Sequence, residues 1–269
     1  AWCAFRGLFL GACEGGLPAP RFTPMDWLRM PTPENQMMAA ALKVPLYESD
    51  LLMPEYRAGE FGDWRLMVGG SGLDRGFHSG MWFVPKMPIL MRRKEGRDWE
   101  TWMSLSVHEI ESQELGCRHA FGTTVVMGLG MGWIALNAAL RPEVDRVIVI
   151  ERDPAVIGLF HESGAVESLP EALRGKIEIV EADALLWQPS APVDFLYADI
   201  WLTLAEPETL DQVRRMQANV RARQVYFWGQ EITLFARAAA WREAGEAWTM
   251  DLVRRCAAEQ LGLPLLLPE

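Results

Sequence analysis

The chain has 269 residues, of which 50% are hydrophobic and 23% charged, values that are typical of a globular protein with one large domain or with a main domain and a smaller one. Its formal net charge of −10 argues against a nucleic-acid partner, because binding to phosphates requires a surplus of Lys and Arg; the acidic surface suits a cationic or neutral small-molecule substrate. No apolar run approaches the roughly 18 residues that span a bilayer, so no membrane segment is predicted.

Residues 1–97 are predicted to form an N-terminal segment with a short helix and a small β-sheet. The helix lies in "PTPENQMMAAALKVPL", with Thr32 as its N-cap, Pro33 at its first position and Pro45 as its terminator. The runs "WRLMVGG" and "GMWFVPKMPILMRR" are rich in β-forming residues and are separated by the glycine-rich "SGLDRGFHSG". This pattern predicts strands of a small antiparallel sheet joined by a loop.

Residues 98–269 are predicted to form the main domain. "DWETWMSLSVHEIESQELGC" has apolar residues at helical spacing from Trp99 to Leu115, and Gly116 is expected to end that helix. Five short apolar runs follow, alternating with helical segments: "TTVVMG", "DRVIVIE", "KIEIVEA", "VDFLYAD" and "RQVYFWG". Strict alternation predicts an α/β fold, with a doubly wound, mostly parallel sheet and helices on both faces. The C-terminus from Glu231 is predicted to be helical.

The cysteines indicate a reducing compartment. Cys3, Cys13, Cys117 and Cys256 lie far apart without a CxxC pair. This spacing predicts reduced, mostly buried thiols in a cytoplasmic protein and no zinc or other metal site. The apolar core of "FRGLFLGAC" is short and is followed by an acidic residue, so no targeting signal is expected there.

A glycine-rich loop follows the first of the five strands. In "TTVVMGLGMGWIALNAA", Gly128, Gly130 and Gly132 stand between an apolar run and a helical pattern. Ligands of open α/β sheets bind at this position, where missing Cβ atoms let a ligand approach the backbone. A dinucleotide fingerprint would require a third glycine at position 133, which is Trp133, so the GxGxG spacing indicates a different nucleotide.

Three carboxylates end the next three strands. Glu151 ends the second strand and is placed to accept hydrogen bonds from a ribose diol, although it also suits a surface carboxylate at a strand end. Asp183 ends the third strand, where it either binds a ligand amino group or caps the next helix. Asp199 ends the fourth strand and is expected to face the same cleft.

The motifs "VVMGLGMG", "VIVIERD", "VEADALLW" and "FLYADIW", in this order and spacing, resemble the Rossmann-like S-adenosylmethionine-dependent methyltransferase superfamily over residues 100–235. Within it the chain is most similar to the spermidine synthase-like branch, in which a small N-terminal β-domain precedes the helix before the glycine loop. The resemblance implies S-adenosylmethionine as cofactor and S-adenosylhomocysteine as product. It further implies that Glu151, with the adjacent Arg152, binds the ribose and that Asp183 and Ala184 bind the adenine. The methionine portion would contact the glycine loop, which consists of Gly128, Leu129, Gly130, Met131 and Gly132.

Two departures argue against spermidine synthesis itself. Aminopropyltransferases carry an acidic residue in the glycine loop, where this chain has Met131. They also have a second carboxylate after the fourth strand, in a position that is Leu202 here. In addition, no pair of strands is evident after "RQVYFWGQE", so the sheet is expected to end with an unfinished edge.

Acceptor-binding and proton-transfer roles are predicted for Asp199, His108 and Glu109, with Glu111 and Glu231 as further candidates. Glu109 and Glu111 are two residues apart, so one is expected to point into the cleft and the other to solvent. Tyr197 is expected in the core. Trp133 and Trp201 flank the ligand-binding turns and are expected either to wall an aromatic pocket or to fill the core.

The predicted function is methyl transfer to a small-molecule acceptor by a cytoplasmic enzyme without nucleic-acid or membrane partners, and a homodimer is the candidate assembly. Two alternatives stay open. One is an aminopropyltransferase-like reaction. The other is a catalytically silent scaffold or subunit, which the apolar tail "LPLLLPE" and an unfinished sheet edge would favour.

Overall fold

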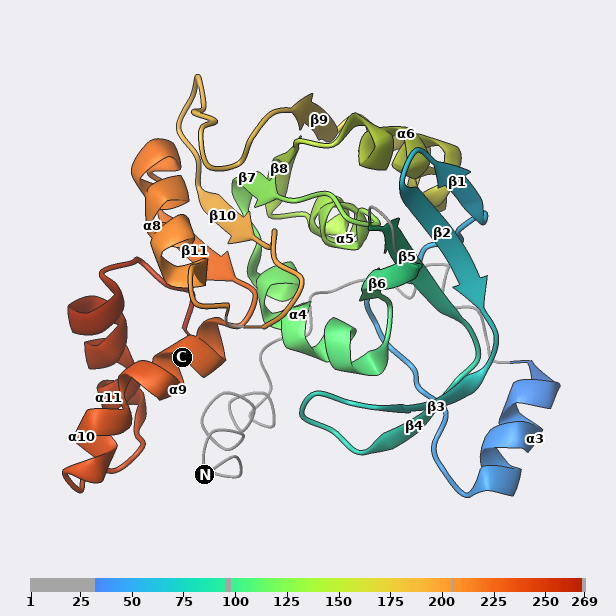
Figure 1. Cartoon of the computed structure of the whole chain (residues 1–269), viewed down its shortest axis with the longest axis horizontal. Helices are drawn as coiled ribbons and strands as arrows, with labels where there is room; N and C mark the ends of the chain where they lie inside the picture. The colour runs from blue at the N-terminus through green and yellow to red at the C-terminus, as the bar shows by residue number, and fades with distance from the viewer. Residues whose placement is uncertain (1–31, 95–97, 205, 268–269) are drawn as a thin grey trace.

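The computed structural model describes residues 32–94, 98–204 and 206–267. A five-stranded parallel sheet forms its centre, with the strand order β11-β10-β7-β8-β9 (Figure 1). The strands are β7 (Gly122–Met127), β8 (Val144–Glu151), β9 (Ile177–Glu181), β10 (Phe195–Ala198) and β11 (Gln224–Phe227). The strand order reverses between β7 and β10, as in doubly wound, Rossmann-like sheets. The predicted fold class is therefore confirmed.

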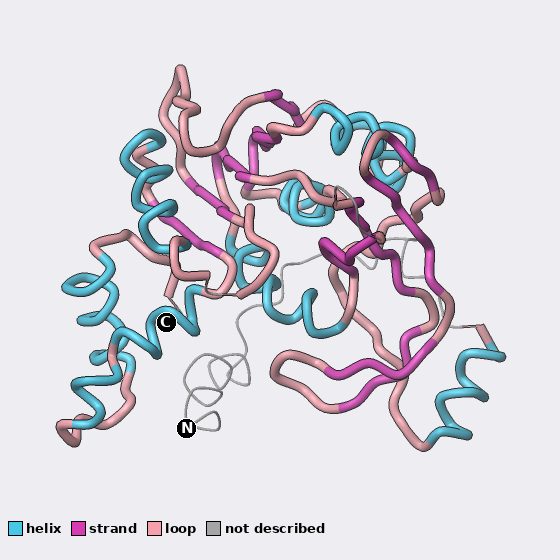
Figure 2. The backbone as a smooth tube through the Cα atoms, viewed as in Figure 1, coloured by secondary structure: helices cyan, strands magenta, loops and turns pink. Residues whose placement is uncertain are grey.

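Helices cover both faces of this sheet (Figure 2). Alternate strand residues divide the core: Val126 and Tyr197 pack with one set of helices, whereas Val125 and Leu196 pack with the other. The first set is α4 (Val107–His119), α5 (Trp133–Leu140) and α6 (Pro154–Glu162). The second set is α8 (Thr209–Val220), α9 (Gln230–Arg237) and α11 (Met250–Cys256). Shorter helical segments are η1 (Ala165–Ser168), α7 (Glu171–Arg174), α10 (Ala239–Glu243) and η2 (Ala257–Leu261).

A smaller antiparallel sheet precedes the parallel one, as predicted. Its strand order is β1-β2-β5-β6, and a separate hairpin pairs β3 with β4. The strands are β1 (Gly59–Phe61), β2 (Trp64–Gly69), β3 (Gly72–Arg75), β4 (Met81–Val84), β5 (Met87–Arg93) and β6 (Trp99–Ser104). The short helix α3 (Pro33–Leu42) begins at its predicted cap, Thr32, but ends at the left-handed Lys43, before Pro45.

The predicted helix from Asp98 onward is wrong in its first turns. Residues 99–104 form β6, which pairs with β5 in the small sheet, and α4 begins only at Val107 after the N-cap Ser106. Gly116 lies inside α4 instead of ending it, and a Cβ at this position would meet the ring of Tyr197. Glycine is therefore required here for the packing of α4 against the sheet.

The expected unfinished sheet edge is covered by the chain's own tail. The Val225 amide donates to the carbonyl of Pro264 at 2.9 Å, and the Leu266 amide donates to the carbonyl of Val225 at 2.7 Å. Leu265, in "LPLLLPE", forms a parallel bridge with Val225 and is 8% exposed. The tail therefore pairs with β11 and buries its leucines, as its apolar composition requires.

The cysteine prediction agrees with the structure where it can be compared: Cys117 and Cys256 are buried free thiols. Cys3, Cys13 and the segment "FRGLFLGAC" lie outside the described residues. Among the described helices, none has the length and apolar character needed to cross a bilayer.

Candidate functional site

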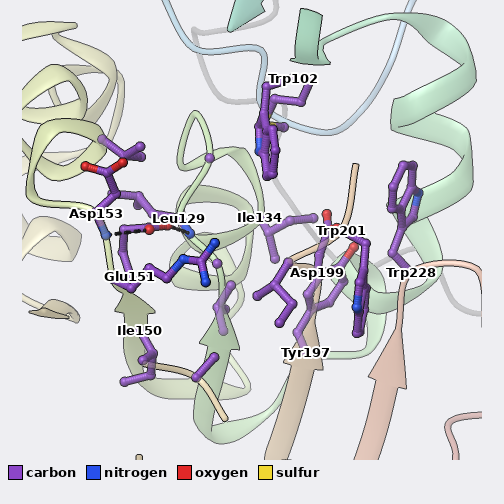
Figure 3. A pocket seen from close by; sticks show the side chains of 18 of the residues that line it. Trp102, Leu129, Ile134, Ile150, Glu151, Asp153, Tyr197, Asp199, Trp201 and Trp228 are labelled. Atoms are coloured by element: carbon purple, nitrogen blue, oxygen red, sulfur yellow. Dashed lines mark hydrogen bonds between the residues drawn. The ribbon is translucent and has the colours of Figure 1, made fainter. Parts of the chain in front are cut away.

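A pocket with a volume of about 290 Å³ opens at the carboxyl ends of β7, β8 and β10. The small sheet and α4 complete its walls. Figure 3 shows two groups of lining residues on opposite sides: Leu129, Glu151 and Asp153 on one, and Tyr197, Asp199, Trp201 and Trp228 on the other. Its position at the switch point of the sheet is the one where open α/β folds bind ligands.

The glycine loop between β7 and α5 lies at the centre of this pocket. Gly128 and Gly130 line it and have φ angles of 98° and 51°. A Cβ at Gly128 would meet the carbonyl oxygen of Asp199, and one at Gly130 would meet the sulfur of Met103. The Cβ directions of both glycines therefore face the protein, so glycine is required here for packing, while the backbone of the loop lines the pocket.

Glu151 connects the end of β8 to the glycine loop. Its carboxylate accepts hydrogen bonds from the amides of Leu129, at 3.0 Å, and Asp153, at 2.9 Å. Asp153 caps α6 through the Ala155 amide and also accepts a 2.7 Å hydrogen bond from the indole of Trp64. These bonds fix the carboxylate at the pocket wall, and Arg152 lines the wall beside it with an exposed side chain.

Asp183 and Ala184 line the pocket after β9. The Asp183 carboxylate accepts a hydrogen bond from the Leu185 amide at 2.8 Å. It closes a turn and does not cap a helix, which differs from the alternative role considered from the sequence. Ala184 is 7% exposed and lies against the second core cluster.

Asp199 and Glu109 come from different elements, Asp199 from the end of β10 and Glu109 from the first turn of α4. Burial and the nearby charge of Glu109 raise the pKa of Asp199 well above its usual value. Burial also raises the pKa of Glu109 to about 7, although hydrogen bonds from Ser104 oppose this. Both carboxyl groups therefore lie where their charged forms are disfavoured.

The start of α4 explains how Glu109 is positioned. Ser106 caps the helix by accepting a hydrogen bond from the Glu109 amide at 3.2 Å, as the spacing S-x-x-E predicts. The Glu109 carboxylate reaches back beyond the cap and accepts a 2.7 Å hydrogen bond from the Ser104 amide. Because Ser104 ends β6, this bond fastens the first turn of α4 to the small sheet.

Several predicted residues lie outside the pocket. His108 is exposed and its ring contacts Phe77 at 5.2 Å, so the structure does not bring it together with Asp199. Glu111 is not solvent-facing as expected: it is 8% exposed and accepts hydrogen bonds from the amides of His78 and Ser79 at 2.9 and 3.1 Å.

The remaining candidates are buried behind the pocket wall. Met131 is 2% exposed, and its carbonyl accepts a 3.0 Å hydrogen bond from Tyr56. Gly132 packs closely against Phe160, whose ring a Cβ at this position would meet. Glu231, on α9, is 7% exposed. None of Met131, Gly132 and Glu231 belongs to the lining of the pocket.

The aromatic residues beside the turns serve different purposes. Trp133 is 1% exposed and its indole donates to the carbonyl of Leu52 at 2.8 Å, which anchors the N-terminal segment. Trp201 lines the pocket, while its indole nitrogen donates to Gln212 at 2.7 Å. Both tryptophans therefore combine the two alternatives, because each belongs to a core cluster and also lines the pocket.

Among the lining residues that the sequence analysis missed, four carry polar or aromatic side chains that bear on binding. Gln113 lies one helical turn after Glu109, and Trp228 follows β11 at the same sheet edge as Asp199, so spacing could have identified both. Arg92 and Trp102 line the pocket from β5 and β6. They depend on the fold of the small sheet, for which the sequence gives no comparable signal.

No family model and no curated protein matches this sequence. Solved structures similar to part of the chain include the DhpI–SAH complex, with 16% identity, a TM-score of 0.30, and coverage of 40% of this chain and 48% of that one. A 23S rRNA methyltransferase, ErmE, has 17% identity and a TM-score of 0.31 (42% and 41% covered). The glycopeptide N-methyltransferase MtfA, complexed with S-adenosyl-L-homocysteine, has 18% identity and a TM-score of 0.32 (41% and 42% covered). The chain spans less than half the length of these three structures, and similarity at this level does not assign an activity.

Proposed function

We propose that the chain is an S-adenosylmethionine-dependent methyltransferase that acts on a small-molecule acceptor. The observation that carries this proposal is the hydrogen bond between the Leu129 amide and the carboxylate of Glu151, in the wall of a single pocket. It joins a GxGxG loop to an acidic residue at the end of the next strand. That combination suits a nucleoside whose ribose contacts the carboxylate.

The residues of the pocket are compatible with this cofactor. A carboxylate has about four lone-pair sites, so Glu151 can accept from a ribose diol while it retains its two amide donors. Asp183 and Ala184 would hold the adenine, and Gly128 to Gly130 would contact the methionine portion. When bound, S-adenosylmethionine supplies an electrophilic methyl group, so the protein has only to position the acceptor, exclude water and accept a proton.

A small acceptor is supported by the size and charge of the pocket. Its volume of about 290 Å³ is near the lower end of the range for small-molecule sites. Six carboxylates and two arginines line it: Glu109, Glu151, Asp153, Asp183, Asp199 and Glu206, with Arg92 and Arg152. An excess of negative charge in the pocket, and a net charge of −10 for the chain, disfavour a polyphosphate acceptor.

Aminopropyl transfer remains a second candidate because of one observation. A small antiparallel sheet precedes α4 and contributes Met103 to the packing of the glycine loop, an arrangement like that of the spermidine synthase-like branch. Against it stands Met131, where that branch has an acidic residue. The scaffold alternative was based on an apolar tail and an unfinished sheet edge, and the pairing of this tail with β11 uses both features within the chain.

Calorimetric titration with S-adenosylmethionine, S-adenosylhomocysteine and decarboxylated S-adenosylmethionine tests the proposal. We expect binding of the first two. A preference for the decarboxylated compound would instead support aminopropyl transfer. If none of the three binds to protein whose circular dichroism spectrum shows it to be folded, the proposed function is wrong.

A further inference from the structure

One end of the pocket collects hydrogen-bond acceptors that have no donor. The oxygen Oε1 of Gln113 and the hydroxyl of Tyr197 are buried without any hydrogen-bond partner, and each side chain is only 1% exposed. Both residues line the pocket together with Asp199 and Glu109. Buried polar groups are normally paired, so two orphan groups beside two carboxylates indicate a ligand that donates several hydrogen bonds.

The charge of this end also lacks compensation within the protein. The pKa of Asp199 is raised by burial and by Glu109, and no lysine or arginine of the described residues counters either effect. The one side-chain amide near Glu109 is that of Gln113, whose Nε2 lies 3.5 Å from the Glu109 carboxylate. A bound cation would supply the missing charge and would favour ionised carboxylates.

The remaining walls are aromatic and offer few donors of their own. Trp201 and Trp228 line this end, but their indole nitrogens are already engaged, with Gln212 at 2.7 Å and with Ser112 at 2.9 Å. They therefore present aromatic surface, which attracts cations and packs against apolar groups. Glu206 also lines the pocket, but its carboxylate already accepts hydrogen bonds from the amides of Leu202 and Thr203 at 3.1 and 3.0 Å.

We propose that this end of the pocket binds the methyl acceptor as the ammonium form of a primary or secondary monoamine with an apolar body. The inference rests on the proposed function and names its substrate class. An ammonium group supplies several donors for Gln113, Tyr197 and Asp199, and its charge offsets that of Glu109, whereas an alcohol or a thiol supplies one donor and no charge. A carboxylate acceptor would be repelled. A diamine is disfavoured, because Leu202 stands where a second carboxylate would follow β10, and Glu206 is held through Oε1 by the amides of its own loop.

The same groups account for the proton. The ammonium loses one proton to the carboxylate of Glu109 or Asp199, which leaves a lone pair on nitrogen. That pair forms the new N–C bond to the methyl group, while the C–S bond breaks and its electrons remain on sulfur. The product leaves as a methylated ammonium, and the carboxyl proton passes to solvent.

The test is a calorimetric titration of protein saturated with S-adenosylhomocysteine, using n-hexylamine, 1-hexanol, hexanoate and 1,6-diaminohexane. Hexylamine should bind at least about ten-fold more tightly than the alcohol or the acid. The reason is that a hydrogen bond to a charged group contributes more binding free energy than one between neutral groups. The diamine should bind no more tightly than hexylamine, once the statistical advantage of its two equivalent amino groups is taken into account. Equal binding of alcohol and amine, or a clear preference for hexanoate or for the diamine, would overturn the inference.

Paired tyrosine variants separate this role from a structural one. Tyr197→Phe removes an orphan hydroxyl and should weaken hexylamine binding by about five-fold or more, without weakening the binding of S-adenosylhomocysteine. Tyr226→Phe is the matched control, because Tyr226 is the register partner of Tyr197 on β11 but donates to the carbonyl of Ser112 at 2.8 Å. It should leave hexylamine binding unchanged. An unaltered hexylamine affinity in Tyr197→Phe contradicts the inference.

Binding of S-adenosylhomocysteine tests the proposed function, and preference for the amine tests the proposed acceptor. Wild-type protein that is folded but does not bind S-adenosylhomocysteine contradicts the proposed function. Protein that binds S-adenosylhomocysteine and shows no preference for the amine contradicts only the assignment of the acceptor. Asp199→Asn provides a further check, since it keeps the shape of the side chain and should reduce hexylamine binding more than S-adenosylhomocysteine binding.

Discussion

The amide of Leu129 donates a 3.0 Å hydrogen bond to the carboxylate of Glu151, and this bond joins the glycine loop after β7 to the end of β8. The two residues are 22 positions apart in the chain. Their contact arises because the carboxyl ends of neighbouring parallel strands meet at one edge of the sheet. Glu151 is therefore both a brace for the loop and the proposed acceptor for the ribose.

Glu151→Ala should weaken the binding of S-adenosylhomocysteine by on the order of 1.5–3 kcal/mol, the range for hydrogen bonds to a charged group. Calorimetric titration measures this directly. Glu181→Ala is the matched control, because Glu181 pairs in register with Glu151 at the end of β9 but is exposed and does not line the pocket. Equal affinities of wild type and Glu151→Ala would remove the assignment of Glu151 to the ribose.

The two glycines that line the pocket should differ in their tolerance of alanine. At Gly130 the new Cβ meets the flexible side chain of Met103, and the φ of 51° is accessible to other residues at a cost of about 1–2 kcal/mol. At Gly128 the φ is 98° and the obstacle is the backbone carbonyl of Asp199, which cannot move aside. Gly128→Ala should therefore cost about 3 kcal/mol or more.

Urea denaturation of both glycine variants provides the comparison. A double variant that adds Met103→Ala should recover part of the loss in Gly130→Ala and none of the loss in Gly128→Ala. Similar unfolding free energies for the two single variants would show that the loop can shift away from β10, and would contradict the packing described for it.

Much of the candidate site could be predicted from the sequence because its residues end strands. Short apolar runs located β7, β8, β9 and β10, and the residue that follows or ends each run then falls at the same sheet edge. This placed Glu151, Asp183 and Asp199 in one pocket without knowledge of any long-range contact. The S-x-x-E spacing of Ser106 and Glu109 also marks the start of α4, but the predicted helix began several residues earlier and did not use this signal.

The errors occurred where pairing with a distant segment decides the structure. Residues 99–104 have apolar side chains that suit a helix as well as a strand, and hydrogen bonds to β5 select the strand. One of Glu109 and Glu111 was expected in solvent, but the donors to Glu111, the amides of His78 and Ser79, are more than 30 positions away and bury it. The pairing of the tail with Val225 is also long-range, and no local pattern predicts it.

The tail should contribute to stability because it covers the edge of β11. Leu265→Asp places a charge at a position that is 8% exposed and should cost about 2–4 kcal/mol. Leu186→Asp is the matched control at a position that is 61% exposed, where a change within about 0.5 kcal/mol is expected. Gel filtration should show self-association of Leu265→Asp, since the uncovered strand edge can pair with another chain. If both variants have the same unfolding free energy, the tail does not stabilise the sheet.

The pH dependence of stability follows from the buried carboxyl groups. Burial raises the pKa of Glu109 and that of Glu231 to about 7, whereas the ordinary value is 4.5. Between these values the folded protein holds more protons than the unfolded chain, so the free energy of unfolding decreases as pH rises. Asp199, whose pKa is raised by burial and by Glu109, acts in the same direction.

Glu109→Gln replaces one of these titrating carboxyl groups with an amide that binds no proton in this pH range. The decrease in unfolding free energy between about pH 5 and pH 8 should become smaller by on the order of 1–3 kcal/mol, the value that corresponds to the raised pKa of Glu109. Urea denaturation at intervals across this range measures the slope, and the exposed Glu181→Gln serves as the control that should leave it unchanged. A wild-type protein that gains stability over this range, or a Glu109→Gln variant with the wild-type slope, would mean that the carboxyl group of Glu109 is already ionised in the folded protein at pH 5. That result would also weaken its assignment as the group that accepts the proton of the amine, since a carboxylate of ordinary pKa is a poor base near neutral pH.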